Sequence, residues 1–234
     1  MTAERPLIEL CDYRLARNGS GFGLPEFTLS VCSGDICAID SNNPDDGHLL
    51  LRALATLVKP SGGAYLFEGR TLDLANYREL LEYKRRIGYI APDAALISNM
   101  TVRNNLLLGR YYFENNLSID LGNDVRRLCA AFGITDILDK RAGGLNSLEM
   151  QAAIVVREIA KKPKILLLNQ PETFIGHARF DFLMEFFNQW IAERLPVVFL
   201  SYDRRLVRRF ANRKILITDG DLTSIETRRT PGAD

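Results

Sequence analysis

The chain of 234 residues has few of the residues that several common kinds of site require. Two histidines leave little for a histidine-rich metal centre, and four cysteines without Cys-x-x-Cys spacing indicate small buried residues in a reduced, cytosolic chain. Positive and negative charges are nearly equal in number, with 30 Lys and Arg and 29 Asp and Glu. The chain therefore has no overall positive charge that would favour nucleic acid. No run of about 18 apolar residues spans a membrane, and the N-terminus lacks the apolar region of a secretory signal.

The composition that remains, 47% apolar and 25% charged, is that of a globular protein with a sizeable core. Short apolar runs at 35–40, 165–168 and 197–200 favour buried parallel strands, with helical spacing between them. Residues 8–10 and 27–31 favour antiparallel strands, and Asp219-Gly220 predicts a hairpin turn near the end. These patterns predict an α/β fold with a mostly parallel sheet, an N-terminal antiparallel part and an inserted helical block.

A strand, a polar loop and a helix follow one another at 35–40, 41–48 and 49–55. This βα unit is the arrangement on which phosphate sites are commonly built, because the N-terminus of the helix attracts anions. The loop is therefore the first place to look for a bound phosphate.

Several segments, in order and spacing, resemble a known family over nearly the whole chain. They are Lys59-Pro60-Ser61-Gly62-Gly63, the strand 84–90, the Thr-Val-Arg run at 99–106, the apolar strand with Pro171 at 165–171, and residues 210–220. The family is the nucleotide-binding subunit of ATP-binding cassette (ABC) transporters. The resemblance implies a fold like that of P-loop NTPases. It also implies a core of residues 1–92 and 161–227, a helical subdomain of residues 93–160 and a tail of residues 228–234.

The resemblance assigns nucleotide contacts to positions at which this chain carries other residues. These positions are Arg17, Ser41, Pro44, Asp45, Asp46, Gly47, His48, Pro92, Asn146, Ser147, Leu148, Asn169, Gln170 and Tyr202. Together they depart from the motifs for the phosphates, magnesium, the attacking water and the adenine ring.

The phosphate loop differs most from the family pattern. Gly47 stands where the family has lysine, and His48 stands where a hydroxyl holds Mg²⁺. Pro44 has no N–H to donate, and Asp45 and Asp46 place carboxylates at the start of a helix. A phosphate approaching this loop meets negative charge.

The strand that normally ends in Asp-Glu ends here in Asn169-Gln170. A glutamine cannot take a proton from water, and loss of a general base costs roughly 10²–10⁴-fold in rate. Neutral residues are consistent with the missing lysine, because carboxylates left alone there would be unpaired charges. We therefore expect a pseudo-ATPase that is not an enzyme, with no catalytic residues, no metal and neither ATP nor Mg²⁺ as a cofactor.

The partner segment keeps the family pattern better than the nucleotide motifs do. By resemblance, a transmembrane permease subunit contacts residues in the groove beside the helical subdomain, here Asp93, Ile97, Asn99, Met100, Val102 and Arg103. We expect a structural or regulatory subunit, cytoplasmic and held at the inner face of the membrane by this partner. A second ABC ATPase subunit, either an active homologue or a second copy, completes the expected assembly, and no nucleic acid is expected.

Two alternatives from other classes stay open. The chain is an atypical ATP-binding protein or ATPase, with cations supplied by Arg14, Arg17 or a partner, or it is a soluble binding module unrelated to transport. Two smaller features also have a second interpretation. His48 with Asp45 or Asp46 is either a metal or acid–base site or an ordinary helix cap. The basic cluster contacts anionic lipid or nucleic acid, or it is a solvated helix face; its members are Arg204, Arg205, Arg208, Arg209, Arg213 and Lys214.

Overall fold

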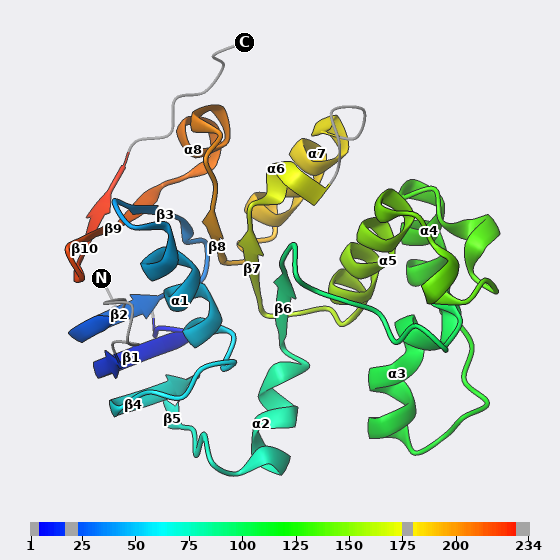
Figure 1. Cartoon of the computed structure of the whole chain (residues 1–234), viewed down its shortest axis with the longest axis horizontal. Coiled ribbons are helices and arrows are strands. Elements are labelled where there is room, and N and C mark those ends of the chain that lie inside the picture. The colour runs from blue at the N-terminus through cyan, green and yellow to red at the C-terminus, as the bar shows by residue number, and fades with distance from the viewer. Residues whose placement is uncertain (1–4, 17–22, 175–179, 228–234) are drawn as a thin grey trace.

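The computed structural model describes residues 5–16, 23–174 and 180–227, which form two β-sheets with helices around them (Figure 1). The antiparallel sheet has the strand order β2 (Leu24–Val31), β1 (Ile8–Leu15), β4 (Gly62–Phe67) and β5 (Arg70–Thr71). The larger sheet has the order β10 (Asp221–Glu226), β9 (Arg213–Thr218), β3 (Ile36–Ser41), β8 (Val197–Leu200), β7 (Ile165–Asn169) and β6 (Ile87–Ile90).

The larger sheet is parallel from β9 to β6, and β10 adds an antiparallel edge. The hairpin that makes this edge turns at Asp219 and Gly220, whose φ angles of 53° and 90° are both positive. Two such residues form the tight turn whose twist matches that of the flanking strands. The predicted fold class, a mostly parallel sheet with an N-terminal antiparallel part, is confirmed.

The helices join the strands of the larger sheet and form a separate group beyond its β6 edge (Figure 1). Those near the sheets are α1 (Pro44–Leu54), α2 (Tyr77–Lys84), α6 (Pro171–Phe174), α7 (Phe180–Ala192) and α8 (Arg204–Phe210). The separate group contains α3 (Val102–Glu114), α4 (Asn123–Ala131) and α5 (Ser147–Ala160), with short 3₁₀ turns at Thr135–Ile137 and Ala142–Gly144.

The larger sheet divides the apolar core into two parts. Along β7, Ile165 and Leu167 pack with the antiparallel sheet and α1, whereas Leu166 and Leu168 pack with the helices of the other face. Successive side chains of a strand point to opposite faces, so a strand buried on both sides is apolar throughout. This explains why the parallel strands appear in the sequence as continuous apolar runs.

The loop expected at 41–48 is shorter in the structure, because α1 already begins at Pro44. Asn43 caps the helix, Pro44 occupies the first helical position, and Asp45 and Asp46 lie in the first turn. Proline suits the first helical position because an N–H at that position would have no acceptor within the helix. Carboxylates in the first turn complement the helix dipole. The helix thus contains residues 44–48, more than half of the predicted phosphate loop.

Candidate functional site

The parallel strands β3, β7 and β8 end along one edge of the larger sheet, and a helix begins shortly after each of them: α1, α6 and α8 (Figure 1). In open α/β sheets, ligands bind outside the carboxyl ends of the strands. The residues between these strands and helices therefore form the candidate site, which we call the sheet-edge site.

Backbone N–H groups in the first turn of α1 are already hydrogen-bonded to atoms of the residue that precedes the helix. The Oδ1 of Asn43 accepts a hydrogen bond from the Asp45 N–H at 3.2 Å, and the Ser41 hydroxyl donates to the Asn43 carbonyl at 2.6 Å. The Asp46 N–H donates to the same carbonyl at 3.1 Å. Pro44 and the Asp45 side chain are exposed. An N-cap of this kind satisfies backbone donors that would otherwise be free to bind an anion.

Asp46 connects α1 to the antiparallel sheet. Its side chain is only 4% exposed, and its Oδ1 accepts a hydrogen bond at 3.1 Å from the N–H of Gly23, the residue before β2. A carboxylate in the first turn of a helix is stabilised by the positive end of the helix dipole. The chain therefore holds a buried negative charge at the α1 N-terminus.

Gly47 faces the sheet rather than the solvent. A Cβ added there would lie 3.2 Å from Leu200 Cδ1 and 3.4 Å from Ile39 Cγ2, which is close contact on both sides. His48 follows and is half-buried. The one basic residue that α1 carries besides this histidine is Arg52, in its last turn. The first turn of α1 therefore supplies carboxylates but no lysine or arginine.

Asn169 ends β7 with a side chain that is 7% exposed, and its Oδ1 has no hydrogen-bond partner in the described part of the chain. Its neighbour is Tyr89 of β6. Burial raises the pKa of the Tyr89 hydroxyl. Asp93 adds to that rise, whereas the charge of Arg52 and a hydrogen bond with Asn169 oppose it. The next residue, Gln170, has a positive φ of 54° and donates its N–H to the Leu200 carbonyl at 2.8 Å.

Glu172 of α6 links the segment after β7 to the segment after β8. Its carboxylate accepts hydrogen bonds from the Ser201 hydroxyl at 2.8 Å and from the Tyr202 N–H at 2.9 Å. The Tyr202 side chain is exposed. Sequence reasoning did not assign a role to Glu172. The signal was an acidic residue directly after Pro171, at the start of a helix that follows a buried strand.

The family implies a nucleotide with Mg²⁺, and the sheet-edge site fits this ligand in one part and not in another. Asn169 offers a buried, unpartnered oxygen, which suits a hydrated Mg²⁺ because this ion prefers oxygen ligands. The first turn of α1 does not form the family's phosphate cradle, because its amides are capped and its side chains are anionic. Phosphate contacts in this chain therefore have to come from other atoms.

The remaining candidate positions are distributed along the chain. Pro92 is exposed just after β6. Asn146, Ser147 and Leu148 are exposed at the start of α5, where Asn146 and Glu149 cap the helix by reciprocal hydrogen bonds of 2.9 and 3.0 Å. Arg17 lies outside the described residues. The fold therefore brings together the positions on α1, β7 and β8, while the α5 positions belong to the separate helical group.

The predicted partner segment is exposed only in part. Asp93, Ile97 and Asn99 are exposed, and Met100 is half-buried. Val102 is 0% exposed and packs in the core, so it offers no surface to a partner. The pattern of the sequence did not show this burial, because Val102 begins α3 and only the packing of that helix covers its side chain.

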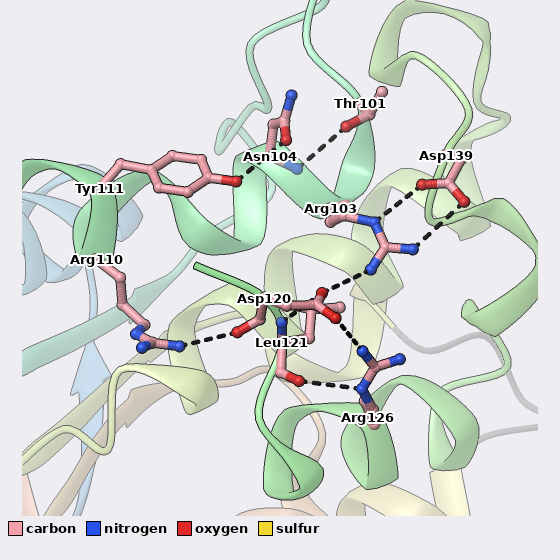
Figure 2. A network of polar contacts seen from close by, with 9 residues as sticks. All are labelled: Thr101, Arg103, Asn104, Arg110, Tyr111, Asp120, Leu121, Arg126 and Asp139. Atoms are coloured by element: carbon pink, nitrogen blue, oxygen red, sulfur yellow. Dashed lines mark hydrogen bonds and ion pairs between the residues drawn. The ribbon is translucent and has the colours of Figure 1, made fainter. Parts of the chain in front are cut away.

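Arg103, the last residue of this segment, is already engaged within the chain (Figure 2). Its guanidinium donates to both carboxylate oxygens of Asp139, at 2.9 and 3.3 Å, and to Asp120 at 3.0 Å. Arg126 pairs with the same Asp120, and Arg110 donates to the Asp120 carbonyl at 3.1 Å. This ionic network (Arg103, Arg110, Asp120, Arg126 and Asp139) ties the segment between α3 and α4 to both helices.

In the described ranges, the structure also shows the surroundings of the candidate metal ligands, the cysteines and the basic cluster. No group of three or more His, Cys, Asp or Glu side chains there is placed to hold a metal ion, and Cys11, Cys37 and Cys129 are free thiols. In the basic cluster, Arg213 pairs with Asp35 at 3.0 Å, and Arg205 pairs with Asp203 at 2.7 Å. No helix among the described residues is long and apolar enough to cross a bilayer.

Comparison with known proteins gives consistent results. The family model described as ABC transporter matches residues 48–173. The phosphonates import ATP-binding protein PhnC 2 of Synechococcus sp. is 29% identical over 206 residues, covering 83% of this chain and 76% of that protein. The molybdenum import ATP-binding protein ModC of Brucella melitensis is 28% identical over 196 residues, covering 83% of this chain but 54% of ModC.

Solved structures show the same fold. The dimeric structure of a post-hydrolysis state of an ATP-binding cassette, bound to ADP and Pi, has a TM-score of 0.77 and 19% identity, with 94% of this chain and 99% of that chain covered. The cbiO1 protein of Clostridium perfringens, part of an ABC transporter complex, has a TM-score of 0.70 and 18% identity, with 94% and 88% covered.

Two sequence-based expectations are wrong in the light of these relatives. We expected a pseudo-ATPase that is not an enzyme, and we expected neither ATP nor Mg²⁺ as a cofactor. Proteins that are 28% and 29% identical to this chain, in alignments that cover 83% of it, are named ATP-binding proteins of import systems. The expectations assumed that a few motif residues alone determine nucleotide binding. The similarity to these relatives extends over most of the chain, far beyond the motif residues. With more than half of its residues matched by the family model, the chain belongs to the ABC transporter family.

Proposed function

We propose that this chain is an ATP-binding subunit of an ABC-type import system and that it uses nucleotide to drive a membrane partner. The observation that carries the proposal is the similarity to PhnC 2 and ModC over 83% of the chain, since both are named import ATP-binding proteins. The chain spans about half the length of ModC, so the activity of a whole protein of that kind is part of the proposal.

The sheet-edge site is where we place the nucleotide. Asn169 would contact Mg²⁺ or one of its waters through its unpartnered Oδ1. When bound, Mg²⁺ neutralises charge on the phosphates and orients them. Glu172 keeps the segment after β8 in place through its bonds to Ser201 and Tyr202. Gln170 holds the turn after β7 against Leu200, so that the two strand ends stay together.

A transmembrane permease subunit and a second ABC subunit are the partners that this function requires. For the permease we propose the exposed part of the predicted segment, Asp93, Ile97 and Asn99. On the neighbouring α3, the Tyr112 side chain is 63% exposed, and the Arg85 guanidinium lies 4.9 Å from the ring centroid of Phe113. Contiguous exposed apolar surface is typical of interaction sites, and Tyr112 packs against Phe113 with ring centroids 5.1 Å apart.

The proposed role also implies a location and a division of the chain. We propose that the chain sits at the cytoplasmic face of the membrane and is held there by its permease. Residues 93–160 would move as a helical subdomain relative to the core of residues 1–92 and 161–227. The separate position of α3, α4 and α5 beyond the β6 edge supports this division (Figure 1).

Calorimetric titration of the full chain with ATP, in the presence of Mg²⁺ or EDTA, tests the proposal. We expect binding of Mg-ATP with a Kd below about 1 mM, equivalent to about −4.1 kcal/mol, and weaker binding in EDTA. We also expect Asn169→Ala to lose most of the difference between Mg²⁺ and EDTA, because it removes the buried oxygen.

Asn188→Ala is the matched control, because Asn188 is exposed on α7, away from β7 in sequence. It is expected to titrate like the wild type. If the wild type shows neither heat of binding nor thermal stabilisation at about 5–10 mM Mg-ATP, the proposed function is contradicted.

A further inference from the structure

The α1 N-terminus already holds an anion that belongs to the chain itself. Asp46 is 4% exposed, and its Oδ1 accepts the N–H of Gly23 at 3.1 Å. It lies in the first helical turn, where the helix dipole favours negative charge. A buried carboxylate of the chain itself therefore lies in the first turn of α1, at the sheet edge.

A second observation shows that this part of the edge is prepared for a ligand. α1 packs against β7, which ends in Asn169 with its buried Oδ1 unpartnered in the described ranges. Buried polar atoms in folded proteins almost always have a partner, so this open acceptor at the end of β7 is a position at which a ligand or a water molecule can bind.

The Asp46 carboxylate and the phosphates of a nucleotide carry charge of the same sign. Because α1 packs against β7, a nucleotide whose Mg²⁺ lay near Asn169 would bring its phosphates toward α1 and the Asp46 carboxylate. Like charges repel strongly in a site that is shielded from water, because the effective dielectric constant there is low. Asp45, on the same turn, is exposed, so water screens its charge far better.

We propose that Asp46 is a built-in competitor for the nucleotide phosphates and sets the affinity of the sheet-edge site for ATP. The proposal rests on the proposed function, since it concerns the same site. Binding requires the Asp46 carboxylate to be displaced or to tolerate the phosphates beside it, and both lower the affinity. The Asp46 carboxylate, held by the hydrogen bond from the N–H of Gly23 just before β2, thus acts as an intrinsic inhibitory charge.

Calorimetric titration of the full chain with Mg-ATP and with adenosine tests this proposal. Asp46→Asn keeps an oxygen to accept the Gly23 N–H but removes the charge, and Asp46→Ser removes both charge and bulk. We expect both variants to bind Mg-ATP at least tenfold more tightly than the wild type, equivalent to about 1.4 kcal/mol. Adenosine, which has no phosphate, is expected to change by less than twofold. Thermal melts verify that each variant is folded.

Two further carboxylates serve as comparisons. Asp45→Asn removes an exposed charge from the same turn and is expected to gain less than Asp46→Asn. Glu185→Gln, on the exposed face of α7, removes the same net charge elsewhere and is expected to leave the affinity unchanged.

Each outcome bears on one claim or the other. A wild type that binds Mg-ATP, with Asp46 variants that bind no more tightly, overturns the role of Asp46 and leaves the proposed function intact. An equal gain for adenosine also overturns it. A wild type that does not bind, with Asp46 variants that do, supports the role of Asp46 and contradicts the proposed function. If no form binds, both are wrong.

Discussion

Glu158 is a buried charge that joins α5 to the sheet. Its side chain is 4% exposed and accepts hydrogen bonds from the Tyr89 N–H at 3.2 Å and from the Arg157 guanidinium at 2.9 Å, with Lys161 as a second cationic partner. A buried carboxylate is tolerated when its partners satisfy it. Removing it leaves a backbone N–H and two cations without their acceptor.

We expect Glu158→Ala to lower the free energy of unfolding by about 2–4 kcal/mol, because breaking a buried ionic contact from one side leaves its partners uncompensated. Urea unfolding followed by circular dichroism measures the loss. Glu82→Ala is the control, since Glu82 forms an exposed pair with Arg85 at 3.3 Å and its loss is expected to cost under about 1 kcal/mol. Equal losses in the two variants would show that Glu158 has no special structural role.

At the scale of elements, the segment between α3 and α4 is held by the ionic network of Figure 2. The pKa of Asp120 is lowered mainly by the hydrogen bond from the Leu121 N–H, and further by the positive charges of Arg126 and Arg103. The side-chain hydrogen bond from Arg103 lowers the pKa of Asp139. A carboxyl group whose pKa is lower in the folded chain than in the unfolded chain stabilises the fold above its unfolded pKa of about 3.9. That contribution is lost as the pH falls through the folded-state pKa.

We therefore expect Arg103→Gln to reduce the loss of stability between pH 5 and pH 3 relative to the wild type. Glutamine removes the charge that stabilises the ionised Asp139 and Asp120, so less stability remains to be lost on acidification. Urea unfolding at the two pH values measures the difference. Arg78→Gln changes an exposed arginine of α2 and is expected to keep the wild-type pH dependence. An unchanged pH dependence in Arg103→Gln would contradict this account of the network.

At the scale of the whole molecule, β7 places neighbouring leucines in two different parts of the core. Leu167 packs with α1 and the antiparallel sheet, and Leu168 packs with the helices that surround Trp190. Because one sheet separates and supports both parts, we expect them to unfold together. Small domains with a shared core usually unfold in one cooperative transition.

Leu167→Ala and Leu168→Ala test this cooperativity as a matched pair. Each is expected to cost about 2–5 kcal/mol, as for other buried leucines truncated to alanine. Trp190 is the one tryptophan in the sequence and is 4% exposed in the helical part of the core. Its fluorescence and the far-ultraviolet circular dichroism should change at the same urea concentration in both variants. Separate transitions in Leu168→Ala alone would show that the two parts unfold independently.

The sequence by itself determined the elements, the fold class and the family. Apolar runs such as 165–168 and 197–200 form the parallel strands, because continuous apolarity suits a strand buried on both faces. Asp219-Gly220 specifies its own turn, because glycine and aspartate tolerate positive φ angles. These are local preferences, so residues a few positions apart suffice to predict them. The assignment of the family's nucleotide motifs to residues 44–48 and 169–170 stays a prediction, and the loss of ATP binding inferred from it was wrong.

Only the tertiary structure decided which side chains meet at the sheet edge. Asp46 and Gly23 are 23 residues apart in the sequence, and Glu172 and Ser201 are 29 apart. Val102 lies in a segment that resembles an interface yet is fully buried. Such contacts depend on how helices and strands pack, and no periodicity within one segment encodes the position of another. Local preference therefore specifies the elements, whereas burial and hydrogen bonding between distant segments specify the site.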